Sequence, residues 1–298
     1  MVIHDPVEDS QHHRRVIACN DPTAANQKTF AQYEQEGWQR NAPTYDTIDL
    51  PTTRQAVPSI LNALGNLQGL HLLELASGTG YLAQQAVAQG ATVTGIDFSS
   101  KMVSLAQQRI PSGATFLVGD AANLPFEANQ FDAAVCSFGF THFAESQTVL
   151  QATARVLKPG GTLAFTIWPE PDPNNNFFGL IKQVCRTHAT MDVDLPPAPS
   201  SRALADPTIR KTMLTQAGFK EISTQTLDLQ WPLQGPKTMV EFILKGSVRT
   251  HMLYERQTRE IQAKIQEALV AATMPYIQAG QESIPCPALL VTASLNPL

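Results

Sequence analysis

The sequence has few of the residues that build metal centres and disulfide frameworks. Only four cysteines occur among its 298 residues, and no two of them have the C-x-x-C spacing that zinc and redox sites use. The four are Cys19, Cys136, Cys185 and Cys286. His12 and His13 are adjacent but lie in a polar segment without further ligands nearby. We therefore expect free thiols in a reducing cytosol and no metal site.

The sequence also lacks long hydrophobic runs and an excess of positive charge. No stretch approaches the roughly 20 apolar residues of a membrane helix, and the first residues have neither the basic flank nor the apolar run of a secretory signal. The formal net charge is -5, whereas nucleic-acid binding rests on clustered Lys and Arg. We expect a cytoplasmic protein with no membrane span and no nucleic-acid partner.

The composition is that of a globular protein, with 43% hydrophobic and 16% charged residues. Residues 1–26 are polar and aperiodic, which predicts a mobile tail. Apolar residues recur at helical spacing over residues 27–66, with interruptions near Pro43 and Pro51, and this pattern predicts an N-terminal helical cap.

Residues 67–168 alternate between apolar strands and amphipathic helices. The predicted strands are His71–Leu75, Thr92–Asp97, Thr115–Asp120, Asp132–Phe138 and Thr162–Trp168, and the predicted helices lie around 80–89, 99–109 and 145–157. Such alternation is typical of a parallel sheet that is covered by helices on both faces.

The alternation stops after Trp168. Residues 169–206 are rich in Pro and Asn and predict an irregular insertion. The remaining elements are predicted as a helix over 207–217, an edge strand over Glu221–Trp231, two cap helices over 237–279 and a last strand over about 287–294. The fold class is therefore α/β: a doubly wound, mostly parallel seven-stranded sheet, with a helical cap from the N-terminus and late insertions over its carboxyl edge.

A glycine turn follows the first predicted strand. The stretch E-L-A-S-G-T-G-Y-L-A begins at Glu74 and contains G-x-G-x-x-A from Gly78, the pattern of a dinucleotide-binding turn. Asp97 lies 17 residues after Gly80, near the spacing of a ribose partner in a nicotinamide dehydrogenase. A dehydrogenase leaves unexplained the acidic residues Glu74 and Asp120, which lie at the ends of the first and third predicted strands.

Further motifs in a fixed order explain these residues better. They are W-Q-R-N-A-P-T-Y-D from Trp38, V-G-D-A-A-N-L-P-F from Val118, F-D-A-A-V-C-S-F from Phe131 and R-V-L-K-P-G-G-T-L from Arg155. Together with the glycine turn, this set resembles the Rossmann-like (class I) S-adenosylmethionine-dependent methyltransferases, in particular the ubiquinone and menaquinone biosynthesis subgroup. The resemblance covers about residues 70–168. The K-P-G-G run is interpreted as a helix stop and turn rather than a site.

The resemblance implies a role for each polar strand end. Asp97 would accept hydrogen bonds from both ribose hydroxyls of S-adenosylmethionine, and Asp120 would accept from the adenine amino group beside the Ala121 N–H. Glu74 would order the glycine loop or meet the cofactor's amino end. The other implied cofactor-binding residues are Tyr45, Ala76, Gly78, Gly80, Phe98, Met102 and Ser137. The purely structural alternative for each carboxylate is that it accepts hydrogen bonds from the N-terminus of the following helix.

His142 follows the fourth predicted strand and is the candidate catalytic base, because its ordinary pKa suits proton abstraction near neutrality. The alternative is a histidine that packs beside the cofactor. Five late aromatic residues are interpreted either as the wall of a pocket for a small hydrophobic metabolite or as core positions of the cap: Phe177, Phe178, Trp231, Phe242 and Tyr254.

The implied reaction is transfer of a methyl group to an O, N or C atom of a small hydrophobic metabolite. The fourth strand ends in C-S-F-G rather than the N-P-P-Y type of enzymes that methylate base amino groups, and the scattered thiols disfavour an arsenite methyltransferase. Two alternatives stay open: a cofactor-bound catalyst of the same fold that does not methylate, such as a cyclase, and a protein or RNA methyltransferase.

Overall fold

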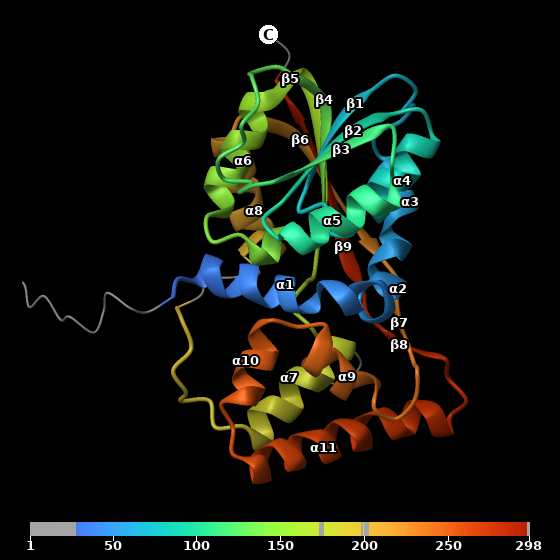
Figure 1. The fold of residues 1–298 in the computed structure, drawn as a ribbon, viewed down its shortest axis with the longest axis vertical. Coiled ribbons are helices and arrows are strands. Elements are labelled where there is room, and N and C mark those ends of the chain that lie inside the picture. Colours follow the sequence, from blue (N-terminus) through green and yellow to red (C-terminus); the bar gives the residue numbers. More distant parts are fainter. Residues whose placement is uncertain (1–27, 173–175, 198, 200–202, 297–298) are drawn as a thin grey trace, which may run out of the picture.

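The central feature of the computed structural model is a seven-stranded sheet of order β3-β2-β1-β4-β5-β9-β6 (Figure 1). Only β9 runs antiparallel to its neighbours, which confirms the mostly parallel sheet. The strands are β1 His71–Leu75, β2 Thr92–Asp97, β3 Ala114–Val118, β4 Phe131–Ser137, β5 Leu157–Ile167, β6 Phe219–Leu227 and β9 Ala288–Leu295. The structure describes residues 28–172, 176–197, 199 and 203–296; the predicted tail at 1–26, with His12 and His13, lies outside them.

Helices cover both faces of the sheet, as the alternating pattern predicts. One apolar cluster joins the sheet to α3 (Val57–Asn62), α4 (Tyr81–Ala88) and α5 (Ser100–Arg109). A second cluster on the opposite face joins it to α6 (Ser146–Val156) and α8 (Pro207–Gln216), the latter preceded by a short 3-10 turn, η4 (Ala203–Ala205). Alternate residues of each strand enter opposite clusters, because side chains point to the two faces in turn.

Two strand boundaries differ from the prediction in ways that matter for the site. β3 ends at Val118, so Asp120 lies in the loop beyond the strand rather than at its end. β5 begins at Leu157, which pairs with Phe131, and the register then shifts before Thr162. The K-P-G-G run occupies this irregularity, with Gly160 at a positive φ of 77°, which agrees with its interpretation as a turn.

The N-terminal helix α1 (Phe30–Ile48) continues through Pro43, so the predicted interruption there is wrong. Thr44 lies next to this proline and its hydroxyl donates to the carbonyls of Asn41 and Lys245, which ties this turn of the helix to the cap. The break comes instead at Asp49, before α2 (Leu50–Thr53), where Pro51 is accommodated in the first turn. A 3-10 turn, η2 (Arg54–Ala56), leads on to α3.

The late insertions hold more regular structure than predicted. The segment 169–206 contains α7 (Phe177–His188), whose N-cap Asn176 accepts from two backbone N–H groups. Residues 237–279 form three helices rather than two: α9 (Thr238–Lys245), α10 (Arg249–Glu255) and α11 (Arg259–Gln278). The predicted edge strand is also divided, because β6 ends at Leu227 and β7 (Gln230–Pro232) pairs instead with β8 (Ser283–Pro285).

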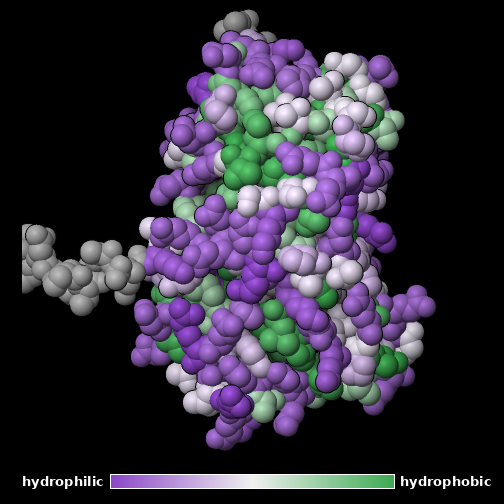
Figure 2. Space-filling model, in the orientation of Figure 1, coloured by the Kyte–Doolittle hydropathy of each residue, from purple (hydrophilic) through white to green (hydrophobic). Residues whose placement is uncertain are grey.

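The late helices form the lower lobe in Figure 1, and α1 crosses between this lobe and the sheet. In Figure 2 hydrophilic side chains cover most of the visible side of α1, and hydrophobic residues gather below it over the cap helices. We call α7, α9, α10 and α11 the cap. They enclose a third apolar cluster, separate from the two on the sheet. Within the described part of the chain, no helix is long and apolar enough to cross a membrane.

Candidate active site

A cavity of about 930 Å³ lies where the carboxyl ends of the sheet strands, α1 and the cap meet. Its lining includes Asp97 at the end of β2, Ser137 at the end of β4, Tyr45 on α1 and Phe242 on α9. Ligands of open parallel sheets bind at this edge, because loops rather than strands occupy it. One cavity therefore joins segments that are far apart in the sequence.

Asp97 organises the polar side of the cavity. One of its carboxylate oxygens accepts from the Gly78 N–H at 2.9 Å, and the other accepts from the Ser99 N–H at 2.9 Å. The helix cap itself is Ser99, whose hydroxyl accepts from Met102 N–H. Asp97 therefore fixes the glycine loop, and each of its oxygens keeps a lone pair for a further donor. Burial raises the pKa of Asp97 to about 6, although both backbone bonds oppose the rise.

The two glycines of the turn have different surroundings. Both have positive φ, 53° at Gly78 and 79° at Gly80. A Cβ on Gly78 would meet nothing within 4 Å, whereas a Cβ on Gly80 would lie 2.9 Å from the Cβ of Ala106 on α5. Gly78 lines the cavity and Gly80 does not. The first glycine leaves space for a ligand, and the second lets α4 begin close to α5.

Glu74 lies behind this loop and does not line the cavity. Its side chain is buried, and one of its oxygens has no hydrogen-bond partner in the structure. Burial and the neighbouring Asp97 raise its pKa well above the ordinary value, and a bond from the Ala83 N–H in the first turn of α4 opposes the rise. This position suits the loop-ordering alternative better than direct contact with a ligand.

The other residues predicted to hold a cofactor gather in the lining. They are Tyr45, Ala76, Phe98, Met102, Asp120, Ala121 and Ser137. Asp120 is exposed, and one of its oxygens accepts from the Ala122 N–H at 2.9 Å, which holds the loop after β3. Tyr45 is half-buried near Asp49 and Asp97, and burial raises the pKa of its hydroxyl.

His142 also lines the cavity, at the end of the 3-10 turn η3 (Gly139–His142) that follows β4. Its Nδ1 lies 2.8 Å from a carboxylate oxygen of Glu34 on α1, and the Glu34 side chain is 5% exposed. Trp38 packs edge-on against the imidazole at a centroid distance of 4.9 Å. In the tautomer that donates from Nδ1–H to the Glu34 carboxylate, Nε2 is the ring nitrogen that carries no hydrogen.

Sequence reasoning missed Glu34. It precedes Trp38 by four residues, which places both on one face of α1, but nothing near it in the sequence indicates a partner 108 residues away. It also missed Asp49, whose buried side chain lines the cavity beside Tyr45.

Aromatic side chains form the cap side of the cavity. Of the five late aromatics, Phe178, Trp231 and Phe242 line it. Phe177 and Tyr254 do not; Phe177 stacks on Trp231 at a centroid distance of 4.0 Å inside the cap cluster. Trp231 and Phe242 meet edge to face at 4.9 Å. The pocket-wall interpretation therefore describes three of these residues, and the core interpretation describes the other two.

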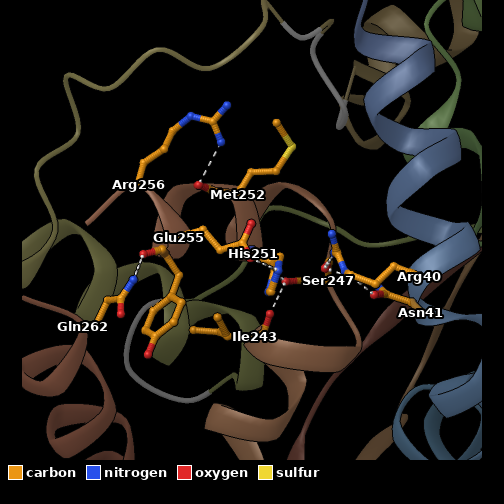
Figure 3. A network of polar contacts seen from close by, with 10 residues as sticks. Arg40, Asn41, Ile243, Ser247, His251, Met252, Glu255, Arg256 and Gln262 are labelled. Carbon is orange, nitrogen blue, oxygen red and sulfur yellow. Dashed lines mark hydrogen bonds and ion pairs between the residues drawn. The ribbon is translucent and has the colours of Figure 1, made fainter. Parts of the chain in front are cut away.

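The cap is held in place by a polar network that reaches α1 (Figure 3). Arg40 and Asn41 on α1 both donate to the carbonyl of Ser247, between α9 and α10. The Ser247 hydroxyl donates to the Ile243 carbonyl and accepts from the His251 N–H. Ser247 itself lines the cavity, so these bonds fix one part of its wall. Among the described residues, no group of three His, Cys, Asp or Glu side chains is placed to hold a metal ion.

Residues 73–165 match the family model described as a methyltransferase domain. The demethylmenaquinone methyltransferase of Thermus thermophilus is 36% identical over 156 residues, which make up 48% of this chain and 68% of that protein. The chain belongs to the Rossmann-like (class I) S-adenosylmethionine-dependent methyltransferases. The corresponding protein of Paenarthrobacter aurescens is 35% identical over 44% of this chain and 53% of its own length. This methyltransferase chain therefore spans about half the length of the first curated relatives it matches.

A solved structure extends the similarity of fold beyond the matched segment. Phosphoethanolamine N-methyltransferase 2 of Haemonchus contortus, in complex with S-adenosylhomocysteine, aligns with 91% of this methyltransferase chain and 61% of its own, at a TM-score of 0.56 and 17% identity. At that identity the alignment shows a common fold. The demethylmenaquinone methyltransferase relatives confirm the family resemblance predicted from the sequence.

Proposed function

We propose that this protein transfers a methyl group from S-adenosylmethionine to an O, N or C atom of a small hydrophobic metabolite. One observation carries the proposal: a single cavity joins the polar, glycine-rich edge of the sheet to an aromatic wall of the cap. Its volume of about 930 Å³ is at the upper end of the range for small-molecule sites, which suits a cofactor and an acceptor side by side.

The donor groups fit the cofactor. The open space over Gly78 admits close approach of a ligand to the backbone, and the free lone pairs of Asp97 suit two ribose hydroxyls. Asp120 and the Ala121 N–H would hold the adenine between Phe98 and Met102. Ala76, Ser137 and Tyr45 would line the methionine end, and Glu74 would fix the loop from behind. The cofactor supplies a methyl group bound to a positively charged sulfur.

The protein's own contribution is positioning, exclusion of water and management of one proton. Alignment of reacting groups supplies several kcal/mol in favourable cases, about 7–11 at most. Where the acceptor is a hydroxyl, it would have to release a proton as it takes up the methyl group. His142 accepts the released proton at Nε2, and Glu34 stabilises the resulting imidazolium through Nδ1–H.

The proposed class of substrate follows from the net charge of the protein and from the cap helices that cover the cavity. The net charge of -5 disfavours RNA, and the cap helices over the cavity leave less room for a protein substrate than an open cleft does. A small molecule is therefore the proposed partner.

The test is an incubation with methyl-labelled S-adenosylmethionine and an extract of the source cells, separated into small molecules, protein and RNA. Label in the small-molecule fraction supports the proposal and provides a product to identify. Label confined to protein or RNA overturns the substrate class. Cofactor binding without transfer to any fraction would favour a catalyst of the same fold that does not methylate.

A further inference from the structure

The side chain of Asp49 lacks a partner that a buried carboxyl group ordinarily has. Asp49 ends α1 and precedes α2, it is 6% exposed, and its Oδ2 has no hydrogen-bond partner in the structure. It makes no side-chain cap bond to α2. An unsatisfied buried polar atom costs about 1–3 kcal/mol, so its presence calls for an explanation in the ligand-bound state.

Asp49 lies at the junction between the two sides of the cavity. Tyr45 is close enough to both Asp49 and Asp97 that each carboxylate raises its pKa, which places Asp49 next to the cofactor side. On the other side it contacts the cap, because a Cβ on Gly246 would lie 3.0 Å from its Oδ2. Phe242 and Trp231 continue the cavity wall from there.

The surroundings of Asp49 favour an uncharged carboxyl group. Burial alone raises its pKa well above the ordinary value, with no contribution from a nearby cation. The cationic residues that line the cavity, Lys182, Arg186 and Arg249, lie too far away to lower it. An uncharged carboxyl both donates and accepts a hydrogen bond, which matches a hydroxyl or carbonyl oxygen. A protonated amine would instead require the ionised form.

We propose that Asp49 is the residue that recognises the acceptor, by hydrogen bonding to an oxygen substituent on a flat ring held against Trp231 and Phe242. The inference rests on the proposed function, because it assigns this side of the cavity to the methyl acceptor. Asp49 positions the acceptor through this substituent, and His142 remains the proton acceptor.

The experiment compares three probes that share one ring system: 2-naphthol, naphthalene and 2-naphthylmethylamine, which is cationic at neutral pH. Binding is measured by titration calorimetry with S-adenosylhomocysteine present and absent. In the unaltered protein we expect 2-naphthol to bind about tenfold or more tightly than naphthalene. Asp49→Ala should abolish this preference, whereas Asp49→Asn should keep most of it, because an amide also donates and accepts.

The matched control is Thr52→Val. Thr52 is three residues away, fully buried, and its hydroxyl also has no partner, but it does not line the cavity. This variant should keep the preference for 2-naphthol. The inference would be overturned if Asp49→Ala kept the preference for 2-naphthol, or if the unaltered protein showed no such preference. It would also be overturned if the amine bound most tightly and lost its affinity in Asp49→Asn. Failure of S-adenosylhomocysteine to bind, with the naphthol preference intact, would count against the proposed function alone.

Discussion

The two sides of the cavity are built in different ways. The sheet side consists of backbone turns and short polar side chains that directly follow strands, such as Gly78, Asp97 and Ser137. The cap side consists largely of aromatic side chains from segments that are far apart in the sequence, Phe178 on α7, Trp231 on β7 and Phe242 on α9. The sheet side therefore suits a ligand that proteins of one fold share. The cap side suits a ligand that differs among proteins of one fold.

The largest expected effect lies where the two sides meet, at the pair of His142 and Glu34. His142→Ala should lower kcat about 10²- to 10⁴-fold for an acceptor that loses a proton, with affinity for S-adenosylhomocysteine nearly unchanged. Single-turnover kinetics and calorimetry measure the two quantities. Glu34→Gln should lower kcat less, because the imidazole keeps its place and loses only the carboxylate as its hydrogen-bond partner. An undiminished rate in His142→Ala would return this residue to a packing role.

The next largest effect tests the sheet side alone. Asp97→Ala should weaken binding of S-adenosylhomocysteine about a hundredfold, which corresponds to about 2.7 kcal/mol, because it removes the acceptor for the ribose and releases the glycine loop. The cap side should be unaffected, so binding of 2-naphthol without cofactor should persist. Unchanged cofactor affinity, with the fold confirmed by circular dichroism, would reject the ribose assignment.

A smaller effect separates the two glycines. Gly80→Ala should lower the free energy of unfolding by about 2–3 kcal/mol, since a methyl group would overlap Ala106 in addition to the cost of positive φ. Gly78→Ala should cost about 1 kcal/mol, from positive φ alone, but should weaken cofactor binding because the methyl group points into the cavity. Urea unfolding and calorimetry on both variants test this; equal losses of affinity would contradict the separate roles.

The smallest effect is in the pH dependence. The pKa of Asp97 is raised from 3.8 to about 6, so in the ligand-free protein it takes up a proton at pH values where the unfolded chain has not. This residue therefore favours the fold as pH falls from about 6 towards 3.8. Cofactor affinity, by contrast, should decrease as the pH falls, because the protonated carboxyl loses acceptor sites. The decrease should be at most about tenfold per pH unit below pH 6.

The control for this pH dependence is Asp97→Asn, which should bind weakly but with little change between pH 5 and pH 7. The titratable neighbours of Asp97 are Glu74, His142, Tyr45 and Cys136. A slope that persists in Asp97→Asn would assign the effect to one of them.

The sheet and its polar edge could be predicted from the sequence because they depend on local patterns. Strands β1 and β2 match the predicted bounds, and the glycine turn brings Asp97 to the loop within 20 residues. The structure of the cap and of its contacts with α1 could not be predicted where it depends on residues that are distant in the sequence. Pro43 stays within a helix because contacts to the cap hold its neighbours, and the Pro- and Asn-rich segment contains α7 because Asn176 caps it. Glu34 and Asp49 could not be recognised because they contact His142 and Gly246, which lie more than a hundred positions away in the sequence.

Helix α1 is bonded to both sides of the cavity within a single turn. The Gln39 side chain accepts from the Ser99 hydroxyl and the Lys101 N–H at the start of α5, and Asn41 donates to Ser247 in the cap. If the cap swings out to admit an acceptor or release a product, α1 must leave one of the two sides. Separation of the cap from the sheet therefore requires that the Gln39 contacts or the Asn41 contact break.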